Sequence, residues 1–189
     1  MTDTQVMYAN VASNMVAALM LVVSWRWRNV GRFLFFALFF WAAQVNMRLG
    51  IWNPHAYLEY ARWAVAPYRA FILGPFARHT GFFVGSIAVG QLAIATLVAL
   101  RGRAVTVGFA GAIIFLLAIA PLGRGSAFPF SLVTAAAAVW LLRQRYQRTL
   151  IGEMGTRVRR RGTSAERRDA LAAPCPEATT SGSSRGTVR

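Results

Sequence analysis

Five long apolar segments constrain the fold of this chain more than any other feature. They cover residues 6–25, 30–47, 81–100, 104–123 and 127–142. Each is near the length of about 20 apolar residues that a helix needs to cross a hydrocarbon core about 30 Å thick. Hydrophobic residues occupy 56% of the 189 positions, more than a water-soluble domain usually carries. The sequence therefore predicts an all-α, polytopic membrane helix bundle with five spans.

Composition divides the chain into three parts. Residues 1–29 hold the first span and a cytoplasmic turn, and residues 30–150 hold a four-helix transmembrane core. The first span begins without a positive charge and is followed by no small-residue cleavage site, so we expect it to be retained. Residues 151–189 are rich in Arg, Ser, Thr, Gly and Pro. Because this tail has almost no large apolar side chains to bury, we expect it to be disordered.

The distribution of arginine predicts the orientation in the membrane. All 21 basic residues are arginines, and about half of them follow residue 142. Arg26, Arg28 and Arg32 follow the first span, and Arg101 and Arg103 separate the third from the fourth. The positive-inside rule places both turns and the tail in the cytoplasm, with the N-terminus and residues 48–80 outside. Exclusive use of arginine is typical of GC-rich bacterial genomes, which indicates a bacterial inner (plasma) membrane.

The net charge of +15 indicates an anionic partner. The part before residue 143 is too apolar for a soluble nucleic-acid domain, so the expected partner is the lipid bilayer and its anionic lipids rather than nucleic acid. The basic run nearest the last span is predicted to bind lipid headgroups, with about 1 kcal/mol per charge; it contains Arg157, Arg159, Arg160 and Arg161. The alternative is a solvated charge run that only enforces topology.

The outside connection is predicted to contain a short interfacial helix over residues 54–66. Asn53 and Pro54 form a favourable N-cap and first-turn pair, and Pro67 would stop the helix. An α-helical period would place three apolar residues on one stripe, namely Leu58, Ala61 and Val65. Aromatic side chains crowd the same segment, as in an interfacial belt.

Few polar groups are available to form a site in or near the membrane. His55, Glu59 and Arg62 would share one stripe of the interfacial helix, either as a solvated face or as part of a pocket. Gln91 has apolar neighbours on both sides, so we expect it to bond inside the bundle, either as structural glue or as a pocket residue. The candidate polar pocket comprises Gln44, Arg48, His55, Glu59, Arg62 and Gln91.

Other small or polar residues predict contacts between helices. Asn10 and Asn14 form a second polar stripe in the first span, where interhelical hydrogen bonding is the expected role. Small side chains let helix backbones approach, and they recur in three spans at Ala9, Ser13 and Ala17, at Gly81 and Gly85, and at Gly108 and Ala112.

No catalytic pattern is present in the sequence. It has no phosphate loop, no G-x-S-x-G, no H-E-x-x-H and no paired acids. His55, Glu59 and His79 are too few to indicate a metal site, and the single cysteine, Cys175, excludes a disulfide framework. We therefore expect no catalytic residue and no metal.

The stretch from Gly90 to Ala120, GQLAIATLVALRGRAVTVGFAGAIIFLLAIA, resembles the DoxX-like four-helix membrane proteins. The likeness extends over residues 30–143. It consists of a glycine followed by a polar residue, then leucines, then a basic turn, and then a span rich in small residues. Gln91 stands where the family usually has glutamate, and Arg48 replaces the lysine that usually ends its first span. The resemblance implies a four-helix DoxX-like core preceded by an additional N-terminal span.

The same resemblance implies a function. Members of the group are small membrane subunits tied to quinone-linked redox systems or to the maturation of partner proteins. We therefore expect a membrane accessory subunit or scaffold with a membrane or extracytoplasmic protein partner. The alternative is a small permease or a quinone-linked oxidoreductase component, with quinone as its cofactor.

Overall fold

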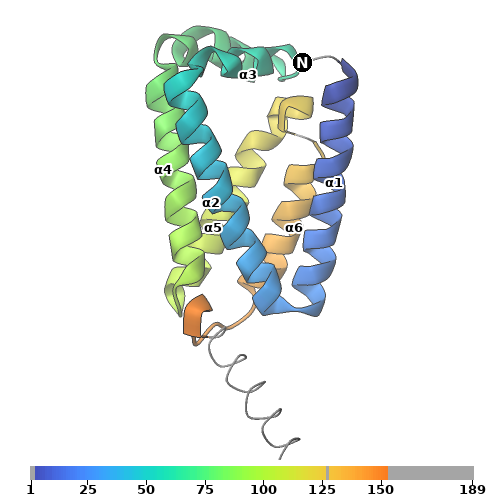
Figure 1. The fold of residues 1–189 in the computed structure, drawn as a ribbon, viewed down its shortest axis with the longest axis vertical. Coiled ribbons are helices and arrows are strands. Elements are labelled where there is room, and N and C mark those ends of the chain that lie inside the picture. Colours follow the sequence, from blue (N-terminus) through green and yellow to red (C-terminus); the bar gives the residue numbers. More distant parts are fainter. Residues whose placement is uncertain (1–2, 127, 153–189) are drawn as a thin grey trace, which may run out of the picture. The chain divides into compact units, whose positions relative to one another are not determined.

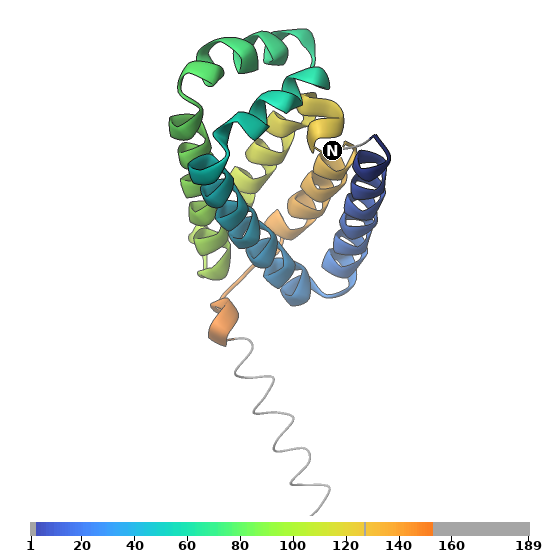
Figure 2. The same ribbon diagram turned by 45° about the horizontal axis from the view of Figure 1, so that its top comes forward.

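The computed structural model describes residues 3–126 and 128–152, and within these ranges it is helical, without strands. The long helices are α1 (Asp3–Arg26), α2 (Arg28–Trp52), α4 (Thr80–Ala99), α5 (Arg103–Ile119) and α6 (Phe130–Leu142). They follow one another around a closed ring, with α2 packed most extensively on α4 and α6 packed back on α1. Figures 1 and 2 show this arrangement. The predicted all-α bundle is confirmed.

Four of the helices are long and apolar enough to cross a membrane: Met7–Arg26, Arg28–Trp52, Thr80–Ala99 and Arg103–Gly123. The predicted fifth span is shorter than the sequence suggested. Helix α6 has 13 residues and begins after Pro129, so at 1.5 Å per residue it extends about 20 Å, against about 30 Å of hydrocarbon. Five spans therefore remain a prediction.

One end of the bundle is covered by the segment between α2 and α4, which we call the cap (residues 53–79). It contains the 3₁₀-helix η1 (Pro54–Arg62), helix α3 (Ala66–Phe71) and the π-helical turn η2 (Ile72–Phe76). We call the opposite end, where α1 meets α2 and α4 meets α5, the turn end. In Figure 1 the cap lies across the top of the bundle and the turn end is at the bottom.

The predicted interfacial helix over residues 54–66 begins where expected, at Pro54, but differs from the prediction in type and in extent. It is a 3₁₀-helix that ends at Arg62, and Asn53 makes no side-chain capping hydrogen bond to it. Pro67 does not stop a helix but lies in the first turn of α3, where its missing N–H is no loss. With three residues per turn, side chains at i and i+3 eclipse. The buried stripe therefore continues from Ala61 to Ala64, and Val65 is exposed.

The cap is bonded to the end of α5. The Val65 N–H donates to the Pro121 carbonyl oxygen at 3.2 Å, and the Tyr68 hydroxyl donates to the Ala118 carbonyl oxygen at 2.8 Å. Both carbonyls lie near the C-terminal end of α5, where carbonyls often lack a partner within the helix. Gly123, in the short helix η3 (Ala120–Ser126), has φ +60° and leaves no room for a Cβ beside the Trp63 carbonyl oxygen. The cap and α5 are thus closely fitted.

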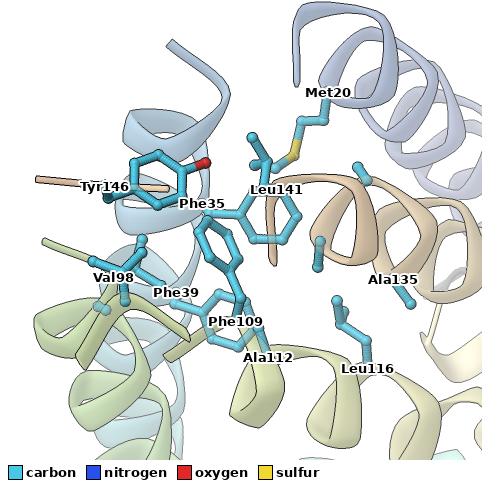
Figure 3. Packing of buried hydrophobic residues seen from close by; sticks show 14 residues of the cluster. Met20, Phe35, Phe39, Val98, Phe109, Ala112, Leu116, Ala135, Leu141 and Tyr146 are labelled. Atoms are coloured by element: carbon cyan, nitrogen blue, oxygen red, sulfur yellow. The ribbon is translucent and has the colours of Figure 1, made fainter. Parts of the chain in front are cut away.

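Phenylalanine rings pack in the interior of the bundle (Figure 3). Phe35 meets Phe109 edge-on with 5.5 Å between ring centroids, and Phe39 meets Phe115 at 5.7 Å. Such edge-to-face pairs add about 0.5–1.5 kcal/mol beyond the burial of their area. These phenylalanine pairs join α2 to α5 across the interior of the helix bundle.

The predicted small-residue contacts are correct in part. A Cβ on Gly108 would lie 2.8 Å from the Val98 backbone nitrogen, and Ala112 is buried, so α5 does approach α4 at this stripe. A Cβ on Gly81 or Gly85 would meet nothing within 4 Å, so the contact predicted for these two residues is wrong. The tightest approach was not predicted: a Cβ on Gly31 would lie 2.6 Å from the Ser24 Cα. There α1 and α2 meet as a hairpin.

Candidate functional site

The residues of the predicted polar pocket occupy different environments. Gln91 is buried within the stripe of α4 that faces α2. The other predicted residues are exposed, on the cap end of α2 or on η1: Gln44, Arg48, His55, Glu59 and Arg62. In a 3₁₀-helix Glu59 and Arg62 share a face, while His55 points about 120° away from it. The predicted stripe of three polar residues rested on an α-helical period and is wrong for that reason.

Gln91 belongs instead to a hydrogen-bonded chain that joins three elements. The Asn46 side-chain amide Nδ2 of α2 donates to Gln91 Oε1 at 2.7 Å, and the Tyr57 hydroxyl of η1 donates to Asn46 Oδ1 at 2.7 Å. The Asn46 amide nitrogen thus donates to α4, and its amide oxygen accepts from the cap. We call Tyr57, Asn46 and Gln91 the polar relay.

The protonation state of Tyr57 fits its role as a donor. Burial, with a smaller effect from neighbouring Tyr60, raises the pKa of Tyr57 to about 12. The Tyr60 pKa is raised as well, by burial first and then by the charge of Glu59. The Tyr57 and Tyr60 rings lie edge to face at 5.9 Å, as the i, i+3 spacing of η1 allows. Tyr57 therefore stays protonated at neutral pH and keeps donating to Asn46.

A second buried polar centre lies near the turn end. Arg32, one turn into α2, is fully buried. Its Nε donates to the Val98 carbonyl oxygen at 2.7 Å, its Nη2 donates to the Leu100 carbonyl oxygen, and its Nη1 donates to the Arg148 carbonyl oxygen at 3.0 Å. The guanidinium carbon lies 4.8 Å from the centre of the Tyr146 ring. We call this arrangement the Arg32 clamp.

The surroundings of Arg32 compensate for the burial of its charge. Val98 and Leu100 lie at the C-terminal end of α4, where carbonyls lack helical partners and the helix dipole is negative. The Tyr146 ring face adds a cation–π attraction. The planar guanidinium has five N–H donors in a fixed fork, which suits several carbonyls at once. The clamp therefore fixes the end of α4 and the segment after α6 to the start of α2.

The sequence contained signals for some of these residues and not for others. Asn46 lies between Gln44 and Arg48 in the sequence, but the predicted pocket took those two residues, which are on another face of the helix. Tyr57 lies in the aromatic-rich segment that the sequence predicts as an interfacial belt. The sequence places Arg32 in the turn after the first span, although it is followed by the apolar run that begins at Phe33. An arginine inside a span is costly unless paired, which was the available signal.

Three further predictions concern Asn10 and Asn14, a metal site and the basic run of the tail. Asn14 Nδ2 donates to the Asn10 carbonyl oxygen at 2.9 Å, within its own helix. Over residues 3–126 and 128–152, no group of three His, Cys, Asp or Glu side chains is placed to hold a metal ion. The predicted lipid-binding run that begins at Arg157 lies outside the described residues.

Comparison of the chain with protein-family models, with curated proteins and with solved structures found no match.

The relay hydrogen bond generates a test. We expect a double-mutant cycle of Asn46→Leu and Gln91→Leu to give a coupling energy of about 0.6–1.7 kcal/mol, the range for hydrogen bonds between membrane helices. The coupling energy is obtained from the unfolding free energies of the wild type, the two single variants and the double variant in mixed micelles. The cycle of Gln44→Leu with Gln91→Leu is the control and should show no coupling, because Gln44 is exposed.

We also expect Gln91→Glu to destabilise the protein more than Gln91→Leu in the same unfolding measurement, since a buried carboxylate is costly.

The Arg32 clamp generates a second test. Arg32→Met removes the donor from one buried carbonyl, that of Val98, and from two part-buried carbonyls, those of Leu100 and Arg148. A buried group left unsatisfied costs about 1–3 kcal/mol, so the unfolding midpoint in detergent should fall strongly. The unfolding midpoint of Arg32→Lys should lie between those of the wild type and Arg32→Met, because the lysine ammonium keeps the charge but lacks the planar fork of donors. Arg26→Met, at an exposed position near the same end, should change the midpoint little. A wild-type midpoint for Arg32→Met would contradict the clamp.

Proposed function

We propose that this chain is a five-span protein of a bacterial inner membrane, with its N-terminus outside and its tail in the cytoplasm. Four membrane-length apolar helices support the embedding. Exposed tryptophans support the boundaries: Trp25 and Trp27 lie at the turn end, and Trp52 lies at the cap end of α2. Helix α2 has 25 residues and extends about 38 Å, which matches a hydrocarbon core with its interfaces.

In this membrane the chain acts as a non-catalytic accessory subunit or scaffold, associated with a redox or quinone-linked complex. The observation that carries the proposal is that the two largest buried polar side chains, Arg32 and Gln91, are engaged by the protein itself. Arg32 is bonded to backbone carbonyls, and Gln91 is bonded to Asn46. Phenylalanine rings occupy the space between α2 and α5. An interior used in this way stabilises a fold, so the functional surface lies on the outside of the bundle.

The cap is the surface that would meet a protein partner. Its ionisable side chains are exposed: His55, Glu59, Arg62, Arg69, Arg78 and His79. Beneath them lies an apolar layer that includes Ile72, Phe76 and Val84, which ties the cap to α4. A polar surface on a fixed support is suited to recognition of an extracytoplasmic or membrane protein. The resemblance to DoxX-like proteins favours a partner from a redox system.

A second candidate function is a small permease or a quinone-linked component. The observation in its favour is a set of buried polar atoms without a hydrogen-bond partner on two helices that pack together. In the part of the chain that the structure describes, they include Asn10 Oδ1 and the Ser24 hydroxyl on α1, and the hydroxyls of Ser131 and Thr134 on α6. Buried polar atoms normally bind a partner, and a water or ligand would supply one.

The orientation is tested by cysteine labelling in intact cells. In a Cys175→Ser background, a cysteine replacing exposed His55 on the cap should react with a membrane-impermeant maleimide from outside. A cysteine replacing exposed Gln147, at the turn end, should react only after permeabilisation. The reverse pattern would overturn the orientation, and labelling of both from outside would overturn the alternation of spans.

The accessory role is tested by site-specific photocrosslinking in native membranes. A photoreactive residue at His55 should give one dominant protein adduct, which mass spectrometry identifies as a subunit of a redox complex. The same residue at Ile114, exposed on the apolar side of α5, is the control and should give lipid adducts only. Stoichiometric quinone in the purified protein, with no protein adduct at His55, would favour the second candidate instead.

A further inference from the structure

Exposed arginines gather around the Arg32 clamp at the turn end. Arg101 and Arg103 flank the turn between α4 and α5, and Arg145 and Arg148 lie in the segment after α6. We call these four residues the basic rim. Figures 1 and 2 show the segment after α6, in orange, reaching the turn between α4 and α5.

Backbone bonds hold the two halves of the basic rim together. The Gly102 N–H donates to the Tyr146 carbonyl oxygen at 2.8 Å. Arg32 donates to the carbonyl oxygens of Leu100 and Arg148, one on each half. Tyr146 and Leu150 are buried, so the segment after α6 is anchored by its side chains as well. The rim arginines are therefore presented from a fixed frame, although their own side chains are exposed.

The charge of the rim is not balanced nearby within the described part of the chain. The acidic residues in that part are Asp3 and Glu59, at the start of α1 and on η1, both at the cap end. Arg32 directs its own charge to carbonyls and so needs no carboxylate. Within the described residues, the turn end thus presents a concentrated positive surface without a neighbouring acidic side chain.

The position of the rim indicates which anion it meets. Exposed Trp25 and Trp27 lie at the same end, and Trp140 is exposed near the end of α6, only three residues before the basic segment begins. Tryptophan prefers the headgroup level of a bilayer, so the arginines just beyond this level lie among lipid phosphates. Arginine is suited to phosphate because its fork binds two oxygens at once.

We propose that the basic rim is a binding site for the phosphate of anionic phospholipid headgroups, built on the folded bundle rather than on the tail. The proposal rests on the membrane embedding proposed above. The Arg32 clamp keeps the turn between α4 and α5 beside the segment after α6, so two pairs of arginines converge on one headgroup layer.

The test titrates phosphatidylglycerol into the full-length protein in a neutral detergent. Retained lipid is counted by native mass spectrometry, and the unfolding midpoint is followed in parallel. Phosphatidylcholine is the headgroup control, and inorganic phosphate at the same concentration separates a lipid site from a general anion site. Wild type should retain and be stabilised by phosphatidylglycerol, with little response to either control.

Two matched triple variants locate the site. The rim variant carries Arg101→Gln, Arg103→Gln and Arg145→Gln. The cap variant carries Arg62→Gln and Arg78→Gln on the cap and Arg48→Gln at the cap end of α2. Both remove three exposed arginines and leave the tail unchanged. Each arginine near an anionic surface contributes about fivefold in affinity, and the three effects multiply. The half-saturating lipid concentration should therefore rise about a hundredfold for the rim variant. It should change by less than about twofold for the cap variant.

Several outcomes would overturn the proposal. An unchanged affinity of the rim variant, or an equal loss in both variants, would show that the tail or the overall charge binds the lipid. Stabilisation by inorganic phosphate as strong as by phosphatidylglycerol would show an anion site without lipid selectivity. If the rim variant does not purify as a folded protein, Arg145→Gln alone replaces it, with an expected loss of about threefold to fivefold. Cysteine labelling reports on the embedding independently.

Discussion

A single buried guanidinium organises one end of this bundle. A charge removed from water destabilises a fold by several kcal/mol unless its surroundings replace the lost solvation. For Arg32 the replacement is three backbone carbonyls and the face of the Tyr146 ring. All of these groups lie outside α2, at the end of α4 or in the segment after α6. The start of α2, the end of α4 and the segment after α6 therefore hold their relative positions because of this charge.

The opposite end is organised by neutral hydrogen bonds. The polar relay connects the cap to α2 and α4 through Tyr57, Asn46 and Gln91. Tyr68 and Val65 connect the cap to the end of α5. None of these bonds uses a charged side chain, and the charged residues of the cap are exposed. Arg69 is a charged side chain that contributes to the fold here as well, because its Nε donates to the Ala61 carbonyl oxygen within the cap at 3.0 Å.

The sequence was informative where the determining interaction is local. Apolar length predicted the four membrane-length helices, since twenty consecutive apolar residues indicate a span without knowledge of the rest. The short last helix was overestimated because its start depends on Pro129 and the preceding turn. Apolar spacing did not distinguish an α-helix from the 3₁₀-helix η1, and the candidate stripe failed there. Gln91 was expected to bond inside the bundle, but Asn46 as its partner depends on how α2 packs against α4.

The separation along the chain between Arg32 and its acceptors has a consequence for biosynthesis. Val98 and Leu100 follow Arg32 by 66 and 68 residues, and Arg148 follows it by 116. When α2 first leaves the ribosome, none of these carbonyls has been made. The charged side chain must therefore remain at the aqueous interface while the next helices insert, which a residue one turn from a helix end can do by extending toward water. Closure of this end of the bundle is then a late event, completed only after the last helix has been translated.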